Sequence, residues 1–182
     1  MKIVSIFDKN LFAIKYTGQT KDEFSRLFEL WQDSEYLERF FETHKKDLKN
    51  GLWGTISVEE AIIETFNNAQ DFEQNLLELS EQSENDQLLG LEKIFNPLND
   101  FQTQIFRLGK SKAKATWLRI YALRVNSNIY IITGGAIKLT QKMQDRKHTN
   151  VELSKIKSCR KYLIDHGIDD IDKVISEIEI KK

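Results

Sequence analysis

Arg119 and Tyr121 occupy alternate positions of the stretch TWLRIYALRV, so a guanidinium and a phenol would project from one strand face. Lys138 and His148 follow further along the chain. Metal-free cleavage of a phosphodiester needs a base for the attacking hydroxyl, cations for the charged phosphorane and a proton donor for the leaving oxygen. Arg119 and Lys138 suit the electrostatic role. Tyr121 or His148 suits proton transfer, since histidine titrates near neutrality and tyrosine does so only beside cations.

Each proton-transfer candidate also has a structural interpretation, which is strand packing for Tyr121 and a surface position beside a helix cap for His148. Residues 1–105 hold 10 Lys/Arg and 20 Asp/Glu, giving −10, whereas residues 106–182 hold 17 and 8, giving +9. This split favours a basic surface that faces a polyanion. Seven cations would hold phosphates without reading sequence: Lys110, Lys112, Lys114, Arg124, Lys142, Arg146 and Lys147.

A predicted β-hairpin positions these residues. Trp117–Val125 and Ile129–Thr133 have strand composition, and residues 126–128 between them are few enough for a hairpin connection. Gly134 and Gly135 are expected to end the second strand, after which the chain leaves the sheet. One face of the first strand would carry Arg119, Tyr121 and Leu123, and the other Leu118, Ile120 and Ala122.

The remaining elements read as support for that hairpin. Ile3–Phe7 and Leu11–Tyr16 predict a first hairpin, 101–108 predicts a strand and 109–114 a cationic loop. Three capping boxes predict helix starts, namely Thr20 with Glu23, Ser57 with Glu60, and Thr149 with Glu152. Further helices are expected from Ser34, over Gln87–Phe95 before Pro97, and from Asp169 to Ile178.

Length and composition predict one domain over residues 1–182 with a helical insertion at about 52–95. Cys159 is the only cysteine, which excludes disulfides within the chain. The three histidines lack ligand-like spacing, so no metal site is expected. Gly109-Lys110-Ser111 lacks the earlier glycine of a phosphate-binding loop. No secretory signal or membrane-spanning run is present, which predicts a soluble cytoplasmic protein.

These residues and their order resemble the RelE/HigB/ParE toxin superfamily. Phe95–Leu98 is similar to its proline-leucine segment, Leu118–Tyr121 to its arginine-bearing strand, and Ile129–Gly134 to its following apolar strand. Lys138-Leu139-Thr140 is similar to its basic-threonine turn, which a closing helix follows. The catalytic tyrosine or histidine near the end of many active members has no clear counterpart.

The resemblance implies an α+β fold, with helices packed on a twisted antiparallel sheet and an additional acidic helical region. It implies a metal-independent mRNA endoribonuclease of a type II toxin-antitoxin system, without a cofactor. Its partners would be mRNA, on the ribosome or free, and a cognate antitoxin, and a homodimer is left open. The alternatives are a non-catalytic toxin that binds a protein target and an inactive nucleic-acid- or protein-binding module.

Overall fold

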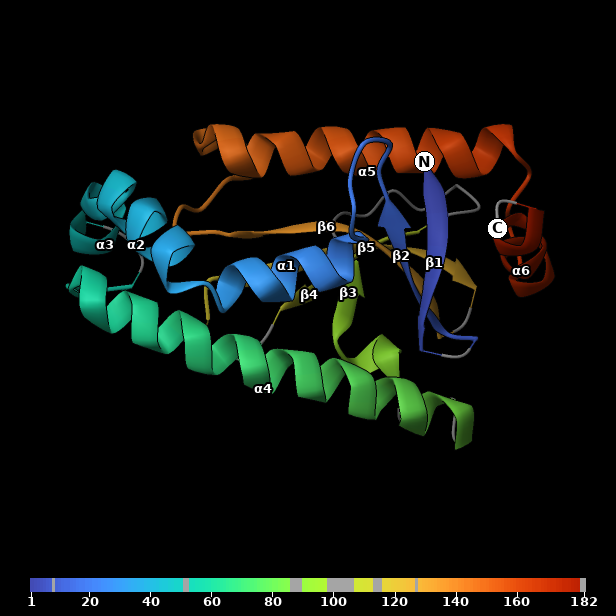
Figure 1. Ribbon diagram of the computed structural model, residues 1–182, viewed down its shortest axis with the longest axis horizontal. Coiled ribbons are helices and arrows are strands. Elements are labelled where there is room, and N and C mark those ends of the chain that lie inside the picture. The colour runs from blue at the N-terminus through green and yellow to red at the C-terminus, as the bar shows by residue number, and fades with distance from the viewer. Residues whose placement is uncertain are drawn as a thin grey trace.

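The computed structural model describes residues 1–7, 9–50, 53–85, 90–97, 107–112, 116–126 and 128–180. Within these ranges the chain is an α+β protein in which six helices pack on a mixed sheet, as Figure 1 shows. The α+β fold class predicted from the sequence is therefore confirmed. None of the helices in these ranges is both long and apolar enough to cross a membrane.

The sheet has the strand order β1-β2-β6-β5-β4-β3. Its strands are β1 (Lys2–Phe7), β2 (Leu11–Lys15), β3 (Phe95–Pro97), β4 (Arg107–Lys112), β5 (Leu118–Asn126) and β6 (Ile129–Ile137). Neighbours pair antiparallel except β2 and β6, which run parallel. The sheet is thus mixed, not wholly antiparallel as expected, because the long helical segment after β2 provides the crossover that a parallel pair requires.

The predicted central hairpin is confirmed, with the two core faces as expected. Leu118, Ile120 and Ala122 pack with the helices on one side, and Tyr121 and Leu123 pack on the other. The expected end of the second strand at the glycine pair is wrong, since β6 continues to Ile137.

The glycines serve close packing within that strand. A Cβ on Gly135 would lie 2.5 Å from the carbonyl oxygen of Arg119 and 2.8 Å from Leu27, and one on Gly134 would overlap the carboxylate of Glu152. Their small size lets a helix approach each face of β6.

Two expectations before the hairpin are also corrected. Residues 109–112 belong to β4, not to a loop, because they pair with β5, Lys110 opposite Tyr121 and Lys112 opposite Arg119. The predicted helix over Gln87–Phe95 is in its described part a 3₁₀ turn, Leu91–Lys93, followed by β3. Residues 86–89, 98–106 and 113–115, which include Lys114 and most of the predicted strand 101–108, lie outside the described residues.

The helices are α1 (Glu23–Trp31), α2 (Ser34–Thr43), α3 (Lys45–Asn50), α4 (Val58–Asn85), α5 (Lys147–Asp165) and α6 (Ile171–Ile180). Helix α4 falls within the range predicted as an insertion. The Ser57 and Glu60 capping box is confirmed, with Glu60 N donating to Ser57 Oγ and Ser57 N to the Glu60 carboxylate.

The other two capping boxes are wrong. Asp22 caps α1 by accepting from Ser25 N at 3.0 Å. Thr149 lies inside α5, where its hydroxyl donates to Arg146 O at 2.9 Å. Glu23 and Glu152, expected to complete these two capping boxes, are instead buried.

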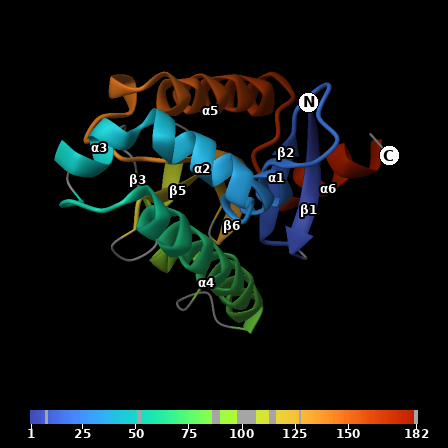
Figure 2. The ribbon, with the colours of Figure 1, turned by 60° about the vertical axis from the view of Figure 1, so that its left-hand side comes forward.

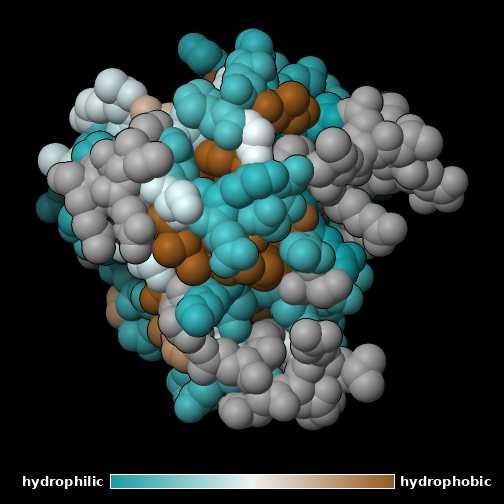
Figure 3. All heavy atoms as spheres, turned by 90° about the vertical axis from the view of Figure 1, so that its right-hand side faces the viewer, coloured by the Kyte–Doolittle hydropathy of each residue, from teal (hydrophilic) through white to brown (hydrophobic). Residues whose placement is uncertain are grey.

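Helices cover both faces of the sheet. Figures 1 and 2 show α5 along one face and α1 and α4 on the other, with α2 and α3 at one end. On the face that α1 and α4 cover, the Phe28 ring packs edge-on against Trp31 and Phe72. The rings of Trp31 and Phe72 are stacked on each other. At the opposite end, near β1 and α6, hydrophobic side chains reach the surface between hydrophilic ones (Figure 3).

Strand β2 covers only part of β6. Its pairing runs from Tyr130 to Ile132, so no strand of the described residues lies on that side of the later half of β6. The Tyr16 hydroxyl donates to Thr133 O at 2.7 Å, which satisfies one carbonyl of this edge. Charged side chains from α1 and α5 meet around the remainder, as described below.

Candidate functional site

Arg119 and Tyr121 lie on the sheet face beneath α5. Arg119 is 7% exposed, and its Nη1 donates to Leu118 O at 2.7 Å and to Thr116 O. Burial lowers the pKa of Arg119. The guanidinium thus bonds the backbone at the start of its own strand and presents little surface to a substrate.

Tyr121 is 1% exposed, and its hydroxyl has no hydrogen-bond partner among the described residues. Burial raises the pKa of this phenol, and the nearby Arg119 opposes that shift only in part. A phenol with a raised pKa is a poor base at neutral pH. The packing interpretation of Tyr121 therefore fits its position.

Lys138 follows β6 at the same end of the hairpin. Its backbone N donates to Trp117 O at 2.8 Å, and its ammonium donates to Thr140 O at 2.6 Å and to Gln141 O. These bonds stabilise the turn that leads towards α5. The electrostatic role expected for Lys138 stays a prediction.

His148, in the first turn of α5, lies beside His44, the C-cap of α2. The two imidazole centroids are 4.8 Å apart, and the Phe40 ring contacts both. His148 Nε2 lies 2.9 Å from Ile137 O. Because a carbonyl only accepts, Nε2 carries the hydrogen, and Nδ1 of a neutral ring is left with the lone pair.

Asp47 and Arg146 form an ion pair close to the two histidines. Arg146 Nε donates to Asp47 Oδ2 at 2.8 Å, and Nη2 donates to Oδ1. Hydrogen bonds from Arg146 lower the pKa of Asp47. The same carboxylate lies 3.6 Å from His44 Nδ1. One fork-shaped ion pair thus joins α3 to the segment before α5, and its carboxylate also faces an imidazole.

Both imidazoles have lowered pKa values. Burial is the first cause for each, and the neighbouring His148 lowers the pKa of His44 further. The negative charge of Asp47 opposes this shift by raising the pKa of both rings. Two adjacent imidazoles resist being charged together, so protonation of one ring disfavours protonation of the other.

His44, Asp47 and Arg146 line a surface hollow of about 590 Å³, which we call the histidine hollow. His148 does not line it but lies behind His44, whose ring it contacts. The lining of the hollow is Glu42, Thr43, His44, Lys45, Lys46, Asp47, Lys49 and Arg146. Lys45 pairs with Glu42, whereas Lys46 and Lys49 are exposed and make no ion pair with any described residue. With four cations against two carboxylates the lining is net positive.

The predicted phosphate-binding residues fall into three groups. Arg146 lines the histidine hollow. Lys142 and Lys147, which precede and follow Arg146 in the sequence, are exposed. Arg124 forms an ion pair with Glu92 at the other end of β5. The backbone of Lys110 and Lys112 belongs to β4, and Lys114 lies outside the described residues.

A second charged cluster, which we call the edge network, surrounds the uncovered half of β6. Arg26 Nε donates to Glu23 Oε1 at 2.8 Å, and Nη2 donates to Oε2 at 2.6 Å. Lys155 Nζ lies 3.0 Å from Glu23 Oε2 and 2.9 Å from Glu152 Oε1. Two cations and two carboxylates thus alternate and tie α1 to α5.

The edge network is mostly closed to solvent. Glu23 and Glu152 are 0% and 5% exposed, and Oε2 of Glu152 has no hydrogen-bond partner in the described chain. Burial raises the pKa of Glu152, which Lys155 opposes. Burial also raises the pKa of the adjacent Cys159 thiol to about 11. The cluster joins two helical layers and presents only the edges of Arg26 and Lys155 outward.

No family model, curated protein or solved structure matches this chain. The described residues also contain no group of three or more His, Cys, Asp or Glu side chains arranged to hold a metal ion. The site's chemistry therefore has to be argued from its own geometry.

Sequence reasoning missed His44, Asp47, Lys46 and Lys49. All four lie in the acidic half of the chain, about a hundred residues before His148, and the Asp47 to Arg146 pair spans 99 positions. Two signals were available locally: the cluster HKKDLK joins a histidine, three lysines and an acid, and it follows the amphipathic helix that ends at Thr43.

Proposed function

We propose that this protein is a metal-independent endoribonuclease of the toxin type that its sequence resembles, with its reaction centre at the histidine hollow. The observation that supports the proposal is the contact between His44 and His148 beside a cationic surface. Two imidazoles can divide the work of base and acid, because a histidine ring can both accept and donate a proton.

The polar neighbours of the two rings support one division of roles between them. In His148, Ile137 O holds the hydrogen on Nε2, so Nδ1 is the base that accepts the proton of the ribose 2′-hydroxyl. The 2′-oxygen then forms its bond to phosphorus. In His44, Asp47 faces Nδ1, so Nε2 of the protonated ring donates to the departing 5′-oxygen as the P–O5′ bond breaks. The products are a 2′,3′-cyclic phosphate and a 5′-hydroxyl.

The lysines of α3 would supply the electrostatic part. Lys46 and Lys49 line the hollow, and their ammonium groups are exposed. Positive charges held where negative charge develops stabilise the phosphorane more than the ground state. Arg146 positions Asp47, and through it His44, in addition to adding charge at the rim.

The substrate on this proposal is single-stranded mRNA, on the ribosome or free. The partner that such a toxin requires is a cognate antitoxin, and covering the exposed lysines of α3 would be enough to block the hollow. An antitoxin of acidic character fits this surface best, since complementary charge guides the encounter.

The test is cleavage of a single-stranded RNA by the purified protein in the presence of a metal chelator. We expect the parent to produce 2′,3′-cyclic phosphate ends. His44→Gln and His148→Gln should each lower the rate by about two to three orders of magnitude, as expected for a lost acid or base. The matched control is His166→Gln, because His166 is exposed at the far end of α5, where its ring contacts Tyr162.

A parent protein that leaves RNA intact, or two histidine variants that cleave as fast as the control, would contradict the proposal.

One observation favours a second candidate, a non-catalytic binding module. Arg119 is buried, and both Arg146 and Arg124 are already paired with carboxylates. RNA that binds with salt-sensitive affinity but is never cut would select that function.

A further inference from the structure

Two large apolar side chains are open to water in the first turns of α4. Ile63 is 61% exposed and Phe66 is 37% exposed. Because they are three residues apart in the helix, they share one face of it. Covering this apolar pair with another molecule would stabilise a complex, since apolar surface is then removed from water.

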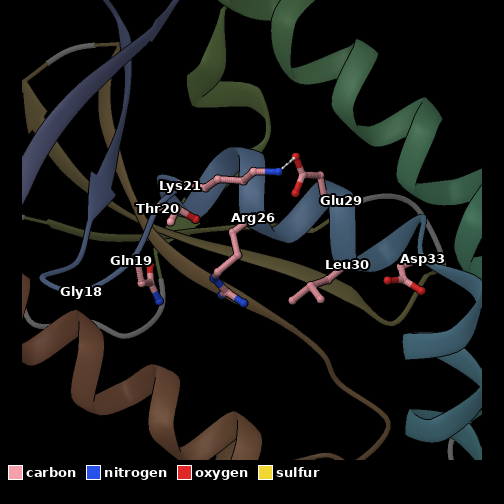
Figure 4. A pocket seen from close by; sticks show the side chains of 8 residues that line it. All are labelled: Gly18, Gln19, Thr20, Lys21, Arg26, Glu29, Leu30 and Asp33. Carbon is pink, nitrogen blue, oxygen red and sulfur yellow. Dashed lines mark hydrogen bonds and ion pairs between the residues drawn. The ribbon is translucent and has the colours of Figure 1, made fainter.

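The apolar pair lies within a strongly acidic helix. Helix α4 holds eight Asp or Glu residues and no Lys or Arg. In its first two turns Glu59 is exposed and Glu64 is half-buried, and neither makes an ion pair with any described residue. On α1, by contrast, the exposed Glu29 is paired with Lys21, as Figure 4 shows. We call the surface made of Glu59, Glu64 and the apolar pair the α4 patch.

The chemistry of the α4 patch fits a partner surface rich in lysine. A lysine has a long alkyl stem below its ammonium group, so the stem packs on apolar side chains while the charge reaches a carboxylate. An ammonium group is also attracted to the face of an aromatic ring such as that of Phe66. An anionic partner such as RNA would be repelled by the two glutamates.

Helix α3 of the same chain presents such a lysine surface. Lys45, Lys46 and Lys49 are all exposed, and the last two make no ion pair with any described residue. Both α3 and α4 pack against α2, and Figures 1 and 2 show α3 and the first turns of α4 at the same end of the molecule. None of the ion pairs among the described residues joins α3 to α4. The basic and the acidic surface are therefore both open to a second molecule.

We propose that a second copy of this chain occupies the α4 patch, in a two-fold dimer where α3 of each copy packs on α4 of the other. A two-fold axis repeats every contact, so a surface with a basic part and an acidic part at one end is complementary to itself. The lysines of α3 reach Glu59 and Glu64, and their stems cover the apolar pair. Two small contacts rich in charge suit a reversible dimer, not a permanent one.

This dimer covers the histidine hollow. Lys46 and Lys49 line that hollow, so α4 of the second copy engages the cations that RNA would bind. The dimer is then a closed form and the monomer an open one, and RNA competes with the second copy for the same lysines. Cleavage per molecule should therefore fall as the protein concentration rises. This consequence rests on the proposed function, whereas the dimer itself does not.

The test is the self-association of the full chain, measured by sedimentation velocity at low salt around ~10 µM, the range expected for a weak interface. The dimer should dissociate at about 0.5 M salt, which screens exposed charges. Ile63→Ser with Phe66→Ser should raise the dissociation constant by about tenfold or more, because each copy contributes both side chains. The matched control is Ile164→Ser, which should leave it unchanged. Ile164 is 51% exposed near the end of α5, on the other side of the sheet (Figure 1).

Reversal of charges identifies the two helices that meet. Lys46→Glu with Lys49→Glu should abolish the dimer, and so should Glu59→Lys with Glu64→Lys. All four changes in one chain should restore it, because the reversed charges of the two helices attract each other again. Circular dichroism establishes that each variant is folded.

A parent that stays monomeric at low salt would overturn the inference. So would a dimer that the Ser variant leaves intact, one that Ile164→Ser weakens equally, or one that the fourfold reversal does not restore. A monomer whose α4 patch binds polylysine would assign the patch to a different basic partner and overturn the dimer. The two proposals fail separately: a dimer that cuts no RNA keeps this interface and loses the nuclease, whereas a monomeric nuclease does the reverse.

Discussion

Two basic regions of this protein use their charges in different ways. Beneath α5, Arg119 is buried and its guanidinium donates to backbone carbonyls of its own strand. In the histidine hollow, Lys46 and Lys49 are exposed and two imidazoles touch beside them. A cation in a strand can thus serve the fold, while cations on a short surface helix remain available to a ligand. Substitutions should therefore cost stability in the first region and activity in the second.

The largest expected effect lies in the buried region, at Gly135. Gly135→Ala would place a methyl group 2.5 Å from the carbonyl oxygen of Arg119, a backbone atom that cannot move aside independently. We expect a loss of about 3 kcal/mol or more in the free energy of unfolding, as for an overpacked core. Urea denaturation followed by circular dichroism measures it.

The control for that variant is Gly54→Ala, where an added Cβ meets nothing within 4 Å but the backbone has φ +78°. It should cost only about 1 kcal/mol, the penalty for a left-handed conformation. Equal stability losses at the two glycines would show that β6 is less tightly packed than described.

Arg119→Ala should have the next largest effect. It removes two charge-assisted hydrogen bonds and leaves a gap under α5, which predicts a loss of about 2 kcal/mol. Lys157→Ala, an exposed position on α5, should be neutral within about 0.5 kcal/mol. An Arg119→Ala protein as stable as the parent would mean that the guanidinium is not structural.

In the histidine hollow, the double substitution Lys46→Ala with Lys49→Ala should change binding and not stability. We expect RNA affinity to fall by about tenfold, and the salt dependence of binding to weaken by about one to two counterions. Fluorescence anisotropy over a range of salt concentrations measures both quantities. A variant that keeps the parent's affinity and salt slope would remove α3 from the RNA surface.

The smallest effect concerns pH. The pKa values of His44 and His148 are lowered by folding, so below their ordinary value near 6.5 the unfolded chain binds protons that the native protein does not. Their contribution to stability is complete above pH 6.5 and declines as the pH falls through the lowered values. The loss should be about 1 kcal/mol or less for the pair.

The control for this pH effect is the variant with both histidines changed to Gln. Urea denaturation at pH 7.5 and 5.5 should show a smaller pH-dependent loss in that variant than in the parent. The difference isolates the histidines from Glu152, whose raised pKa acts in the opposite direction. Identical pH dependence in both proteins would mean that burial does not perturb these rings.

The elements were predictable because their signals are local. The hairpin followed from its composition and short connection, and the inward stripe of α1 from Phe24, Leu27 and Trp31 at helical spacing. The parallel pairing of β2 with β6 was not predictable, because the sequence of neither strand specifies which distant strand it pairs with.

The site was only partly predictable. His148 and Arg146 were identified from their types, but their partners His44 and Asp47 come from the other half of the chain. Glu23 shows a second limit. A glutamate three residues after Thr20 has the pattern of a capping box, yet Asp22 makes the cap and frees Glu23 for burial against Lys155. The same pattern serves both outcomes, and only packing decides between them.

The division between the two regions is tested most directly by one side-by-side measurement, the rate of RNA cleavage per folded molecule for His148→Gln and Arg119→Ala relative to the parent. We expect His148→Gln to lose about two to three orders of magnitude while retaining the parent's stability. Arg119→Ala should cleave within about threefold of the parent once its lower folded fraction is taken into account. The reverse result, with Arg119→Ala inactive although folded and His148→Gln fully active, would place the reaction centre on the sheet face and contradict the histidine hollow.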